Sequence, residues 1–385
     1  MRVALIHDWL TGMRGGEKVL EVFCELFPHA HLYTLLHNKE SVSAIIENMD
    51  IRTSFVQKFP LIIKKKYRHL LPIFPTAIER FNLEGYDLVL SSSHCVAKGV
   101  ITGPDTLHVC YCFTPMRYIW DMYDEYFTKE KSSAITRKSI SLMLGYLRKW
   151  DVASSKRVDR FVAISKYVAE RIKKYYERES EIIFPPVDCS YFNPGTSNGN
   201  FYLMVSPLAP NKRVDIAIKA FNKLSLPLKI IGTGQEEKRL GKIAGKNVEL
   251  MGWQSDEVVR EHYVNCKALI FPGVEDFGIV PLEAQACGKP VIAYGKGGVL
   301  ETVIPLNGNK LNTEGGNRKS ATGMFFYEHT PESLAQAVIH FESVKGLFNK
   351  IKIREHAETF DMAIFKERIR NYIDQEYNEF RKQIN

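Results

Sequence analysis

Two glutamates frame the segment with the clearest chemistry, the string Glu275-Asp276-Phe277-Gly278-Ile279-Val280-Pro281-Leu282-Glu283. An apolar run at 268–271 precedes it, and proline suits a first helical turn because its missing N–H would have no acceptor there. The pattern predicts a strand, a loop and a helix whose first amides can bind a ligand, namely those of Phe277, Gly278, Ile279 and Val280. Carboxylates beside such amides can accept hydrogen bonds from sugar or ribose hydroxyls. The alternative for Glu283 is that it only complements the helix dipole.

Two adjacent cations lie between another predicted strand, 201–205, and a predicted helix, 214–223. They are Lys212 and Arg213, at the end of a loop that begins Ser206-Pro207-Leu208-Ala209. A lysine and an arginine in such a loop can hold a diphosphate, the arginine through two parallel N–H groups. The alternative is that one of the two side chains is merely solvated at the surface.

Three glycines of the second half follow predicted strands. Gly232 and Gly234 come after the apolar run 228–231, and Gly252 comes after 248–251. A glycine lets a ligand approach the backbone closely. Each of these turns can therefore abut a nucleotide, although each is ordinary by itself.

A further glycine pair lies near the N-terminus. Gly15 and Gly16 separate the apolar run 3–6 from a predicted helix at 17–26. The N-terminus of a helix attracts anions, so this loop can approach a phosphate. A tight structural turn explains the pair equally well.

Short apolar runs alternate with helical patterns along the chain, which predicts parallel strands covered by helices on both faces. In the first half the predicted strands are 3–6, 87–91, 108–112, 160–164 and 182–184. In the second half they are 201–205, 228–231, 248–251, 268–271 and 291–293, with helices at 214–223, 256–265 and 281–287. We therefore expect an α/β protein with two Rossmann-like sheets in tandem.

The turn-forming run at 193–200 is the best linker candidate. We expect one domain at 1–192 and a second at 193–364, followed by an amphipathic helix at 365–385. Ligands of open parallel sheets bind beyond the carboxyl ends of the strands. Two such sheets facing each other would enclose one central cleft. The glycine-rich stretch 306–322 is expected to be a surface loop or lid.

The composition fits a globular protein of two domains: 385 residues, of which 45% are hydrophobic and 25% charged. It excludes a disordered tail, a collagen-like fibre and a disulfide miniprotein. The net charge of +8 is mild and gives no indication of nucleic-acid binding. Seven scattered cysteines without a C-x-x-C pattern argue against disulfides and a zinc site. No apolar run is long enough for a membrane span, and early charges argue against a signal peptide, which favours a cytoplasmic protein.

Basic residues concentrate at 52–80, where seven lysines and arginines face a single acid and alternate with apolar residues. Such a segment can contact an anionic membrane surface or a lipid-diphosphate substrate. The alternative is an ordinary solvated loop or helix face.

The spacing of the pieces in the second half resembles the retaining glycosyltransferases of family 4, which have the GT-B fold. Glu275 and Glu283 match the E-x7-E element of that family, and Lys212 matches its phosphate-binding lysine. The resemblance covers nearly the whole chain. The strings at 8–18 and 114–118 are similar to one branch in particular, the mannosyltransferases of bacterial O-antigen and exopolysaccharide assembly.

The resemblance also implies roles for single residues. Glu275 would meet the donor-sugar hydroxyls and Glu283 the ribose, while the backbone N–H groups of Gly278 and Ile279 would reach sugar and phosphate. The glycine pair of the first loop would lie near the donor phosphate and the acceptor. The C-terminal helix would cross back onto the first domain.

Two positions depart from the family pattern. Pro207 stands where the family often has arginine, and Arg213 is a candidate for supplying that charge. Phe113 stands where related members tend to carry a histidine associated with the transferred sugar. His108 lies at the other end of the same predicted strand, so a structural role is the better interpretation for it.

The reaction implied is transfer of a hexose with retention, expected to be mannose from GDP-mannose, onto a polyprenyl-diphosphate-linked glycan at the inner membrane face. Lys212, Arg213 and the amides before Pro281 would stabilise the departing diphosphate, which can itself take the acceptor proton. No D-x-D sequence occurs, so no obligatory metal is expected. The alternatives are a GT-B epimerase or hydrolase of nucleotide sugars and a non-catalytic nucleotide-sugar-binding subunit.

Overall fold

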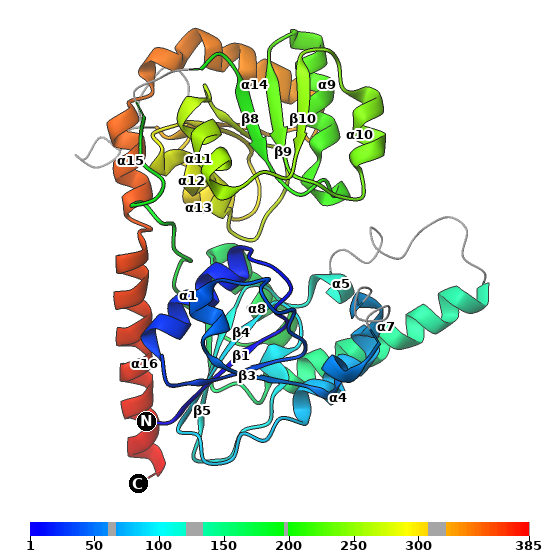
Figure 1. Cartoon of the computed structure of the whole chain (residues 1–385), viewed down its shortest axis with the longest axis vertical. Helices are drawn as coiled ribbons and strands as arrows, with labels where there is room; N and C mark the ends of the chain where they lie inside the picture. The colour runs from blue at the N-terminus through cyan, green and yellow to red at the C-terminus, as the bar shows by residue number, and fades with distance from the viewer. Residues whose placement is uncertain (61–66, 121–133, 196–198, 307–320, 385) are drawn as a thin grey trace. The chain divides into compact units, whose positions relative to one another are not determined.

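A computed structural model of the chain describes residues 1–60, 67–120, 134–195, 199–306 and 321–384, without the side chains of Arg68, His69 and 134–141. The chain divides into two compact units (Figure 1). Unit 1 comprises Met1–Phe184 and Lys366–Asn385, and unit 2 comprises Pro185–Phe365.

The division after Phe184 falls earlier than the predicted boundary after residue 192. Val187 forms a parallel bridge with Asp361, and its amide donates to the Phe360 carbonyl at 3.0 Å. The Cys189 amide donates to an Asp361 carboxylate oxygen at 3.3 Å. These hydrogen bonds attach the segment after Phe184 to unit 2.

Unit 1 contains a parallel sheet of seven strands in the order β3-β2-β1-β4-β5-β6-β7. The strands are β1 (Val3–His7), β2 (His31–Thr34), β3 (Asp50–Thr53), β4 (Leu88–Ser93), β5 (Leu107–Cys112), β6 (Arg160–Ala163) and β7 (Glu181–Ile182). The connecting helices are α1 (Gly15–Leu26), α2 (Ala44–Glu47), α4 (Phe74–Glu79), α5 (Arg117–Trp120), α7 (Ala134–Ser155) and α8 (Lys166–Tyr176), with 3-10 turns η1 (Phe55–Lys58), η2 (Tyr67–Ile73) and η3 (Ala97–Gly99).

Unit 2 contains a parallel sheet of six strands in the order β10-β9-β8-β11-β12-β13. The strands are β8 (Tyr202–Val205), β9 (Leu228–Ile231), β10 (Val248–Gly252), β11 (Leu269–Phe271), β12 (Val291–Tyr294) and β13 (Gly323–Phe326). The connecting elements are η4 (Pro210–Lys212), α9 (Val214–Leu224), α10 (Glu237–Ile243), α11 (Asp256–Asn265), α12 (Ile279–Ala286), α13 (Val299–Thr302), α14 (Pro331–Val344), η5 (Lys345–Leu347) and α15 (Lys350–Glu358). The predicted pair of tandem α/β sheets is confirmed.

The last helix, α16 (Met362–Ile384), runs from unit 2 into unit 1. Within unit 1, Lys366 forms an ion pair with Glu25 of α1 at 2.7 Å, and Glu376 pairs with Arg160 at the start of β6. The Arg368 guanidinium donates to the Ile182 carbonyl of β7 at 3.0 Å. Ion pairs and a backbone contact therefore attach the helix to this unit.

All seven cysteines are described, and all are buried free thiols. Burial raises the pKa of Cys24, Cys189, Cys266 and Cys287 to about 12. The absence of a disulfide framework stays an expectation, with which these free thiols agree.

Two predicted functional segments lie partly outside the described residues. The basic segment 52–80 includes residues 61–66, and the glycine-rich stretch 306–322 includes 307–320. Two described cations of the first segment have partners within the chain, since Arg52 pairs with Asp50 at 2.8 Å and the Arg80 guanidinium lies 5.2 Å from the Phe55 ring centre. Membrane contact by this segment stays a prediction. No helix in the described ranges is long and apolar enough to cross a membrane.

A buried ion pair joins η3 to α7 inside unit 1. Lys98 Nζ lies 2.8 Å from an Asp151 carboxylate oxygen and donates to Ser154 Oγ at 2.8 Å. The Trp150 and Tyr176 rings face the same ammonium at 5.2 and 5.0 Å. Removing one member of such a pair leaves a buried charge without compensation.

We therefore expect Lys98→Met to lower the free energy of unfolding by about 3–5 kcal/mol, measured by urea denaturation. The matched control is Lys173→Met, which breaks the pair with Glu179 whose side chains are 68% and 82% exposed. That control should change stability little. Equal losses in the free energy of unfolding for the two substitutions would show that the buried pair stabilises the fold no more than the exposed pair does.

Candidate functional site

The sheet of unit 2 reverses its strand order between β8 and β11. At such a position the loops after the two strands leave toward opposite faces of the sheet, and a crevice opens at the carboxyl edge. The loop after β8 spans 206–213 and the loop after β11 spans 272–278. These loops carry the cations and the first glutamate that the sequence singled out.

Lys212 and Glu275 come together at this edge. Lys212 Nζ forms an ion pair with Glu275 Oε1, and the two side chains are 20% and 23% exposed. The loops abut closely, since a Cβ on Gly273 would lie 3.2 Å from Lys212 Cα. An ammonium and a carboxylate that are both reachable from solvent can separate to bind a phosphate and a hydroxyl.

Arg213 lies beside this pair but is held by its own neighbours. Its Nε lies 3.3 Å from an Asp215 carboxylate oxygen, and a terminal nitrogen lies 3.2 Å from His329 Nδ1. His329 Nε2 lies 2.8 Å from the Pro272 carbonyl, so it donates there while Nδ1 accepts from the arginine. Desolvation lowers the pKa of His329, which keeps the ring neutral. His329 was not predicted from the sequence, because it follows β13, a strand that was not predicted either.

The N-terminus of α12 faces the same loops. Gly278 adopts φ +100° just before the helix, a conformation that favours glycine. The first amides of the helix, including those of Ile279 and Val280, have no intrahelical acceptor. The Phe277 side chain is buried against the Phe360 ring, so only its backbone is a candidate for ligand contact.

Glu283 lies in a different setting from the predicted one. It is the fifth residue of α12, beyond the first turn, and its side chain is 8% exposed. Its carboxylate accepts a hydrogen bond from the buried Tyr263 hydroxyl at 2.9 Å. The helix predicted at 281–287 begins two residues earlier, at Ile279, and this places Glu283 beyond the first turn. Its proposed contact with ribose stays untested.

The glycines after β9 have a packing function. A Cβ on Gly232 would lie 2.1 Å from the Ser206 carbonyl oxygen, and one on Gly234 would lie 2.4 Å from the Leu208 carbonyl oxygen. Both glycines therefore allow the loop before Lys212 to lie against the end of β9. Gly252 differs, because a Cβ there would meet nothing within 4 Å.

The glycine loop of unit 1 lies within the first turn of α1. The predicted helix at 17–26 begins earlier, at Gly15, because these glycines adopt helical conformation. A Cβ on Gly16 would lie 3.5 Å from the Phe113 ring and 3.7 Å from the His7 ring. Gly16 therefore lets the helix start approach both rings.

His108 has the structural role expected from the sequence. Its Nε2 lies 2.8 Å from Ser91 Oγ in the neighbouring strand, and burial lowers its pKa to about 3. His94, like His329, was not predicted from the sequence. It follows β4, and its ring centre lies 6.5 Å from that of Phe113.

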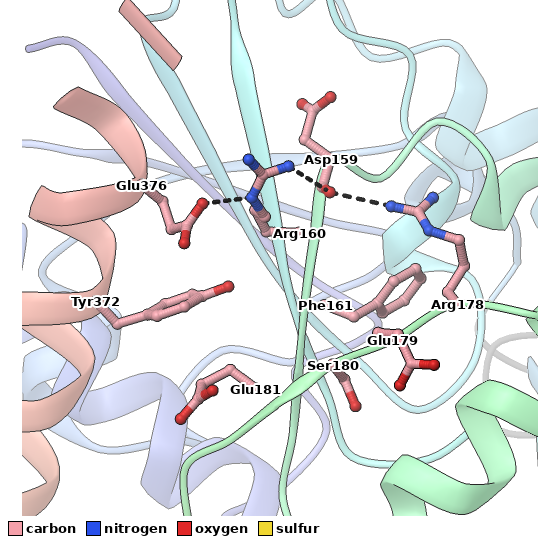
Figure 2. A pocket seen from close by; sticks show the side chains of 9 residues that line it. All are labelled: Asp159, Arg160, Phe161, Arg178, Glu179, Ser180, Glu181, Tyr372 and Glu376. Atoms are coloured by element: carbon pink, nitrogen blue, oxygen red, sulfur yellow. Dashed lines mark hydrogen bonds and ion pairs between the residues drawn. The ribbon is translucent and has the colours of Figure 1, made fainter. Parts of the chain in front are cut away.

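A separate cavity of about 430 Å³ lies in unit 1 at the starts of β6 and β7. Figure 2 shows Arg160 directed to Glu376 of α16, and Arg178 directed to the Asp159 carbonyl, which it reaches at 3.0 Å. These arginines are used within the chain, and no predicted donor-binding residue lines the cavity. The described ranges also contain no group of three or more His, Cys, Asp or Glu side chains arranged to hold a metal ion.

Comparison with known proteins agrees with this architecture. A family model described as Glycosyl transferases group 1 matches residues 192–357. The chain is 30% identical to an uncharacterized glycosyltransferase of Methanocaldococcus jannaschii, over 56% of this chain and 63% of that protein.

Two mannosyltransferases are also similar. The yeast (Saccharomyces cerevisiae) alpha-1,3/1,6-mannosyltransferase ALG2 is 24% identical over 83% of this chain and 73% of its own length. A GDP-mannose-dependent monoacylated alpha-(1-6)-phosphatidylinositol monomannoside mannosyltransferase of Corynebacterium glutamicum is 30% identical over 39% of this chain and 48% of its own length. The matches thus span about half to three quarters of the three relatives.

Among solved structures, Anabaena HepE in complex with UDP-glucose superposes with a TM-score of 0.68 at 15% identity, covering 97% of this chain and all of that one. Its fold is GT-B, so the predicted fold class is confirmed.

The packing function of Gly232 is directly testable. Gly232→Ala would place a methyl group 2.1 Å from a backbone oxygen at φ +139°, so we expect a loss of about 2–4 kcal/mol in the free energy of unfolding. The matched control is Gly241→Ala in α10, where the nearest atom would lie at an ordinary 3.9 Å and alanine favours the helix. Urea denaturation of both variants measures the difference, and equal stability would contradict the packing role.

Proposed function

We propose that the chain, whose residues 192–357 match the model of group 1 glycosyl transferases, transfers a hexose from a nucleotide diphosphate sugar with retention at the anomeric carbon. The observation that supports this best is the Lys212–Glu275 pair. It lies where the sheet of unit 2 reverses, beside the N-terminus of α12. A phosphate-binding cation, a hydroxyl-binding carboxylate and the amides of a helix N-terminus are the groups that a nucleotide sugar requires.

In this proposal the donor diphosphate replaces Glu275 as the partner of Lys212. The amides of Phe277, Gly278, Ile279 and Val280 add a helix N-terminus to the same anion. Glu275, released from the lysine, binds hydroxyls of the transferred sugar. Glu283 binds the ribose after its hydrogen bond from the Tyr263 hydroxyl is broken. Arg213 adds positive charge from its position beside His329, and Gly232, Gly234 and Gly252 let the nucleotide approach the backbone.

Negative charge develops on the departing diphosphate as the bond to the anomeric carbon breaks. Cations and amides fixed in advance stabilise that charge more than they stabilise the bound donor, which lowers the barrier. The carbon acquires oxocarbenium character, as in glycoside hydrolysis. The leaving phosphate oxygen accepts the acceptor proton, so the reaction needs no protein nucleophile and no metal.

The donor that we favour is GDP-mannose. Two of the relatives are named as mannosyltransferases, and one of these is GDP-mannose-dependent. The acceptor that we favour is a polyprenyl-diphosphate-linked glycan of O-antigen or exopolysaccharide assembly. The name of the Corynebacterium relative specifies a lipid-linked mannoside as its acceptor. Unit 1 would bind the acceptor, at an anionic membrane surface that the segment 52–80 contacts from the cytoplasmic side.

Donor choice is tested by thermal shift with GDP-, UDP- and dTDP-sugars. A ligand that binds only the folded state stabilises it by RT ln(1 + [L]/Kd), so at equal concentrations the tightest-binding sugar nucleotide raises the melting temperature most. We expect GDP-mannose to give the largest rise. A larger rise with UDP-glucose, which occupies the HepE structure, would redirect the proposal to a glucosyltransferase. No rise with any nucleotide sugar would overturn it.

The ion pair is tested by Lys212→Gln, which removes the charge and leaves a polar, slightly shorter side chain. We expect kcat/KM for the donor to fall about 10²–10³-fold, the range for losing one group that stabilises developing charge. Lys223→Gln is the matched control, because Lys223 is exposed in the same unit and pairs with Glu332. Initial-rate kinetics measure both variants, and unchanged kcat/KM in Lys212→Gln would rule out the assigned role.

Metal independence is tested by adding EDTA to the assay. We expect an unchanged kcat, since Lys212 and the α12 amides take the place of a cation on the diphosphate. Proton NMR of the product in the same assay should show the anomeric configuration of the donor. Activity that is lost with EDTA and restored by magnesium would contradict the proposed mechanism.

A further inference from the structure

The sheet of unit 1 also reverses its strand order once, between β1 and β4. Asp8 follows β1 and His94 follows β4, so both residues lie at the carboxyl edge where a crevice is expected. Sequence patterns do not connect them, because they lie 86 residues apart. Neither residue belongs to the predicted donor site of unit 2.

Asp8 is a buried carboxylate that orders the turn after β4. One oxygen accepts from the amides of His94 and Cys95 at 2.7 and 3.0 Å, and the other from Val96 and Ala97 at 2.7 and 2.8 Å. The first oxygen also lies 3.0 Å from His94 Nδ1. Burial would raise the pKa of Asp8, but His94 outweighs it and the pKa falls to about 2. Asp8 is therefore a fixed negative partner for the imidazole.

The His94 side chain is only partly buried. The edge of the Trp9 ring packs against it at 4.6 Å between centres, and the side chain keeps 27% of its surface exposed. Within the described ranges, no group hydrogen-bonds to Nε2 of this ring. A carboxylate at Nδ1 orients Nε2 outward, as in the dyads that act on bound hydroxyls.

The surroundings of His94 suit a hydroxylated ligand. The half-buried Phe113 ring and the first turn of α1 at Gly16 lie at the same edge. His7 adds a second observation: its ring is fully buried, and its Nε2 has no hydrogen-bond partner in the described structure, although a Glu17 carboxylate oxygen lies 4.0 Å away. An aromatic face beside fixed polar groups is the usual composition of a sugar site.

We propose that His94 is a substrate-binding residue of unit 1, whose Nε2–H donates a hydrogen bond to a sugar hydroxyl, and that Asp8 positions it. The ligand class rests on the proposed function, since either the transferred sugar or the acceptor glycan supplies such a hydroxyl. We assign the sugar contact to His94 because His7 and His108 are buried and the Phe113 side chain has no polar atom.

The charges around His94 favour the doubly protonated ring that donates from both nitrogens. Desolvation would lower its pKa, but the charge and hydrogen bond of Asp8, together with Glu17, outweigh desolvation and the repulsion of Arg14, so the pKa is raised above 6.5. His7 stays neutral, because burial lowers its pKa to about 4. The sugar contact should therefore be strongest at low pH and weaken as pH rises through the raised pKa.

The experiment compares His94→Asn with His340→Asn, an exposed histidine of α14, as the matched control. Asparagine can keep the hydrogen bond to Asp8 while it loses the reach of Nε2. His94→Gln is the second variant, because its longer amide regains that reach and should restore part of the contact. Melting temperatures confirm that each variant is folded.

Two arms distinguish the source of the hydroxyl. Calorimetry measures the affinity for GDP-mannose relative to GDP, and initial rates measure KM for octyl α-mannoside as an acceptor analogue. We expect His94→Asn to weaken one of these about 10–100-fold, the range for a hydrogen bond to a charged group. A weaker affinity for GDP-mannose relative to GDP identifies the transferred sugar as the ligand of His94. A higher KM for octyl α-mannoside identifies the acceptor instead. If both values stay within twofold of the control, the proposal is overturned.

Nitrogen NMR of the imidazole provides a readout that needs no turnover. Octyl α-mannoside or GDP-mannose should shift the His94 Nε2 resonance, and the effect should decrease as pH rises through the raised pKa. A shift without any turnover would support the sugar site while contradicting the proposed function. If the enzyme turns over but the Nε2 resonance does not shift at any pH from 6 to 8.5, the proposed function stands and the role of His94 is rejected.

Discussion

Each sheet of this protein reverses its winding once, and that single reversal determines where chemistry can occur. Parallel strands need crossover connections, and at one position the connections diverge to opposite faces of the sheet. In unit 1 this happens between β1 and β4, and in unit 2 between β8 and β11. The loops at these two positions carry Asp8 with His94 and Lys212 with Glu275.

The two pairs differ in how firmly they are held. Asp8 accepts four backbone amides besides the imidazole and is fully buried, so its position is fixed before any ligand arrives. Lys212 and Glu275 have mainly each other, and both are partly exposed. A ligand can therefore compete for the second pair but cannot displace the first. Rigid glycine packing behind Lys212 keeps that competition local to the side chains.

Local patterns were sufficient to predict most of the sheets. Buried apolar runs such as 3–6 and 228–231 predicted central strands, because a strand covered on both faces must be apolar throughout. β3 escaped prediction because it is an exposed edge strand with the polar sequence Asp-Ile-Arg-Thr. β13 is only four residues long and begins with glycine, so its apolar run was too short to distinguish it.

The candidate site was predictable only where its residues are close in sequence. The string from Glu275 to Glu283 revealed a loop and a helix, and the Lys212 loop was recognisable beside a strand. The helix boundaries, the Tyr263 partner of Glu283 and the His329 partner of Arg213 depend on contacts between distant segments. Asp8 and His94 are the extreme case, since only strand order brings them together.

The buried cysteines have a practical consequence for studying how the two units move. A thiol reacts as thiolate, and these thiols are both inaccessible and held protonated where burial raises their pKa. A cysteine introduced on the surface would therefore be labelled selectively while the native ones remain in place. One dye on each unit would then let energy transfer report their separation in solution, with and without ligand, in an otherwise unaltered chain.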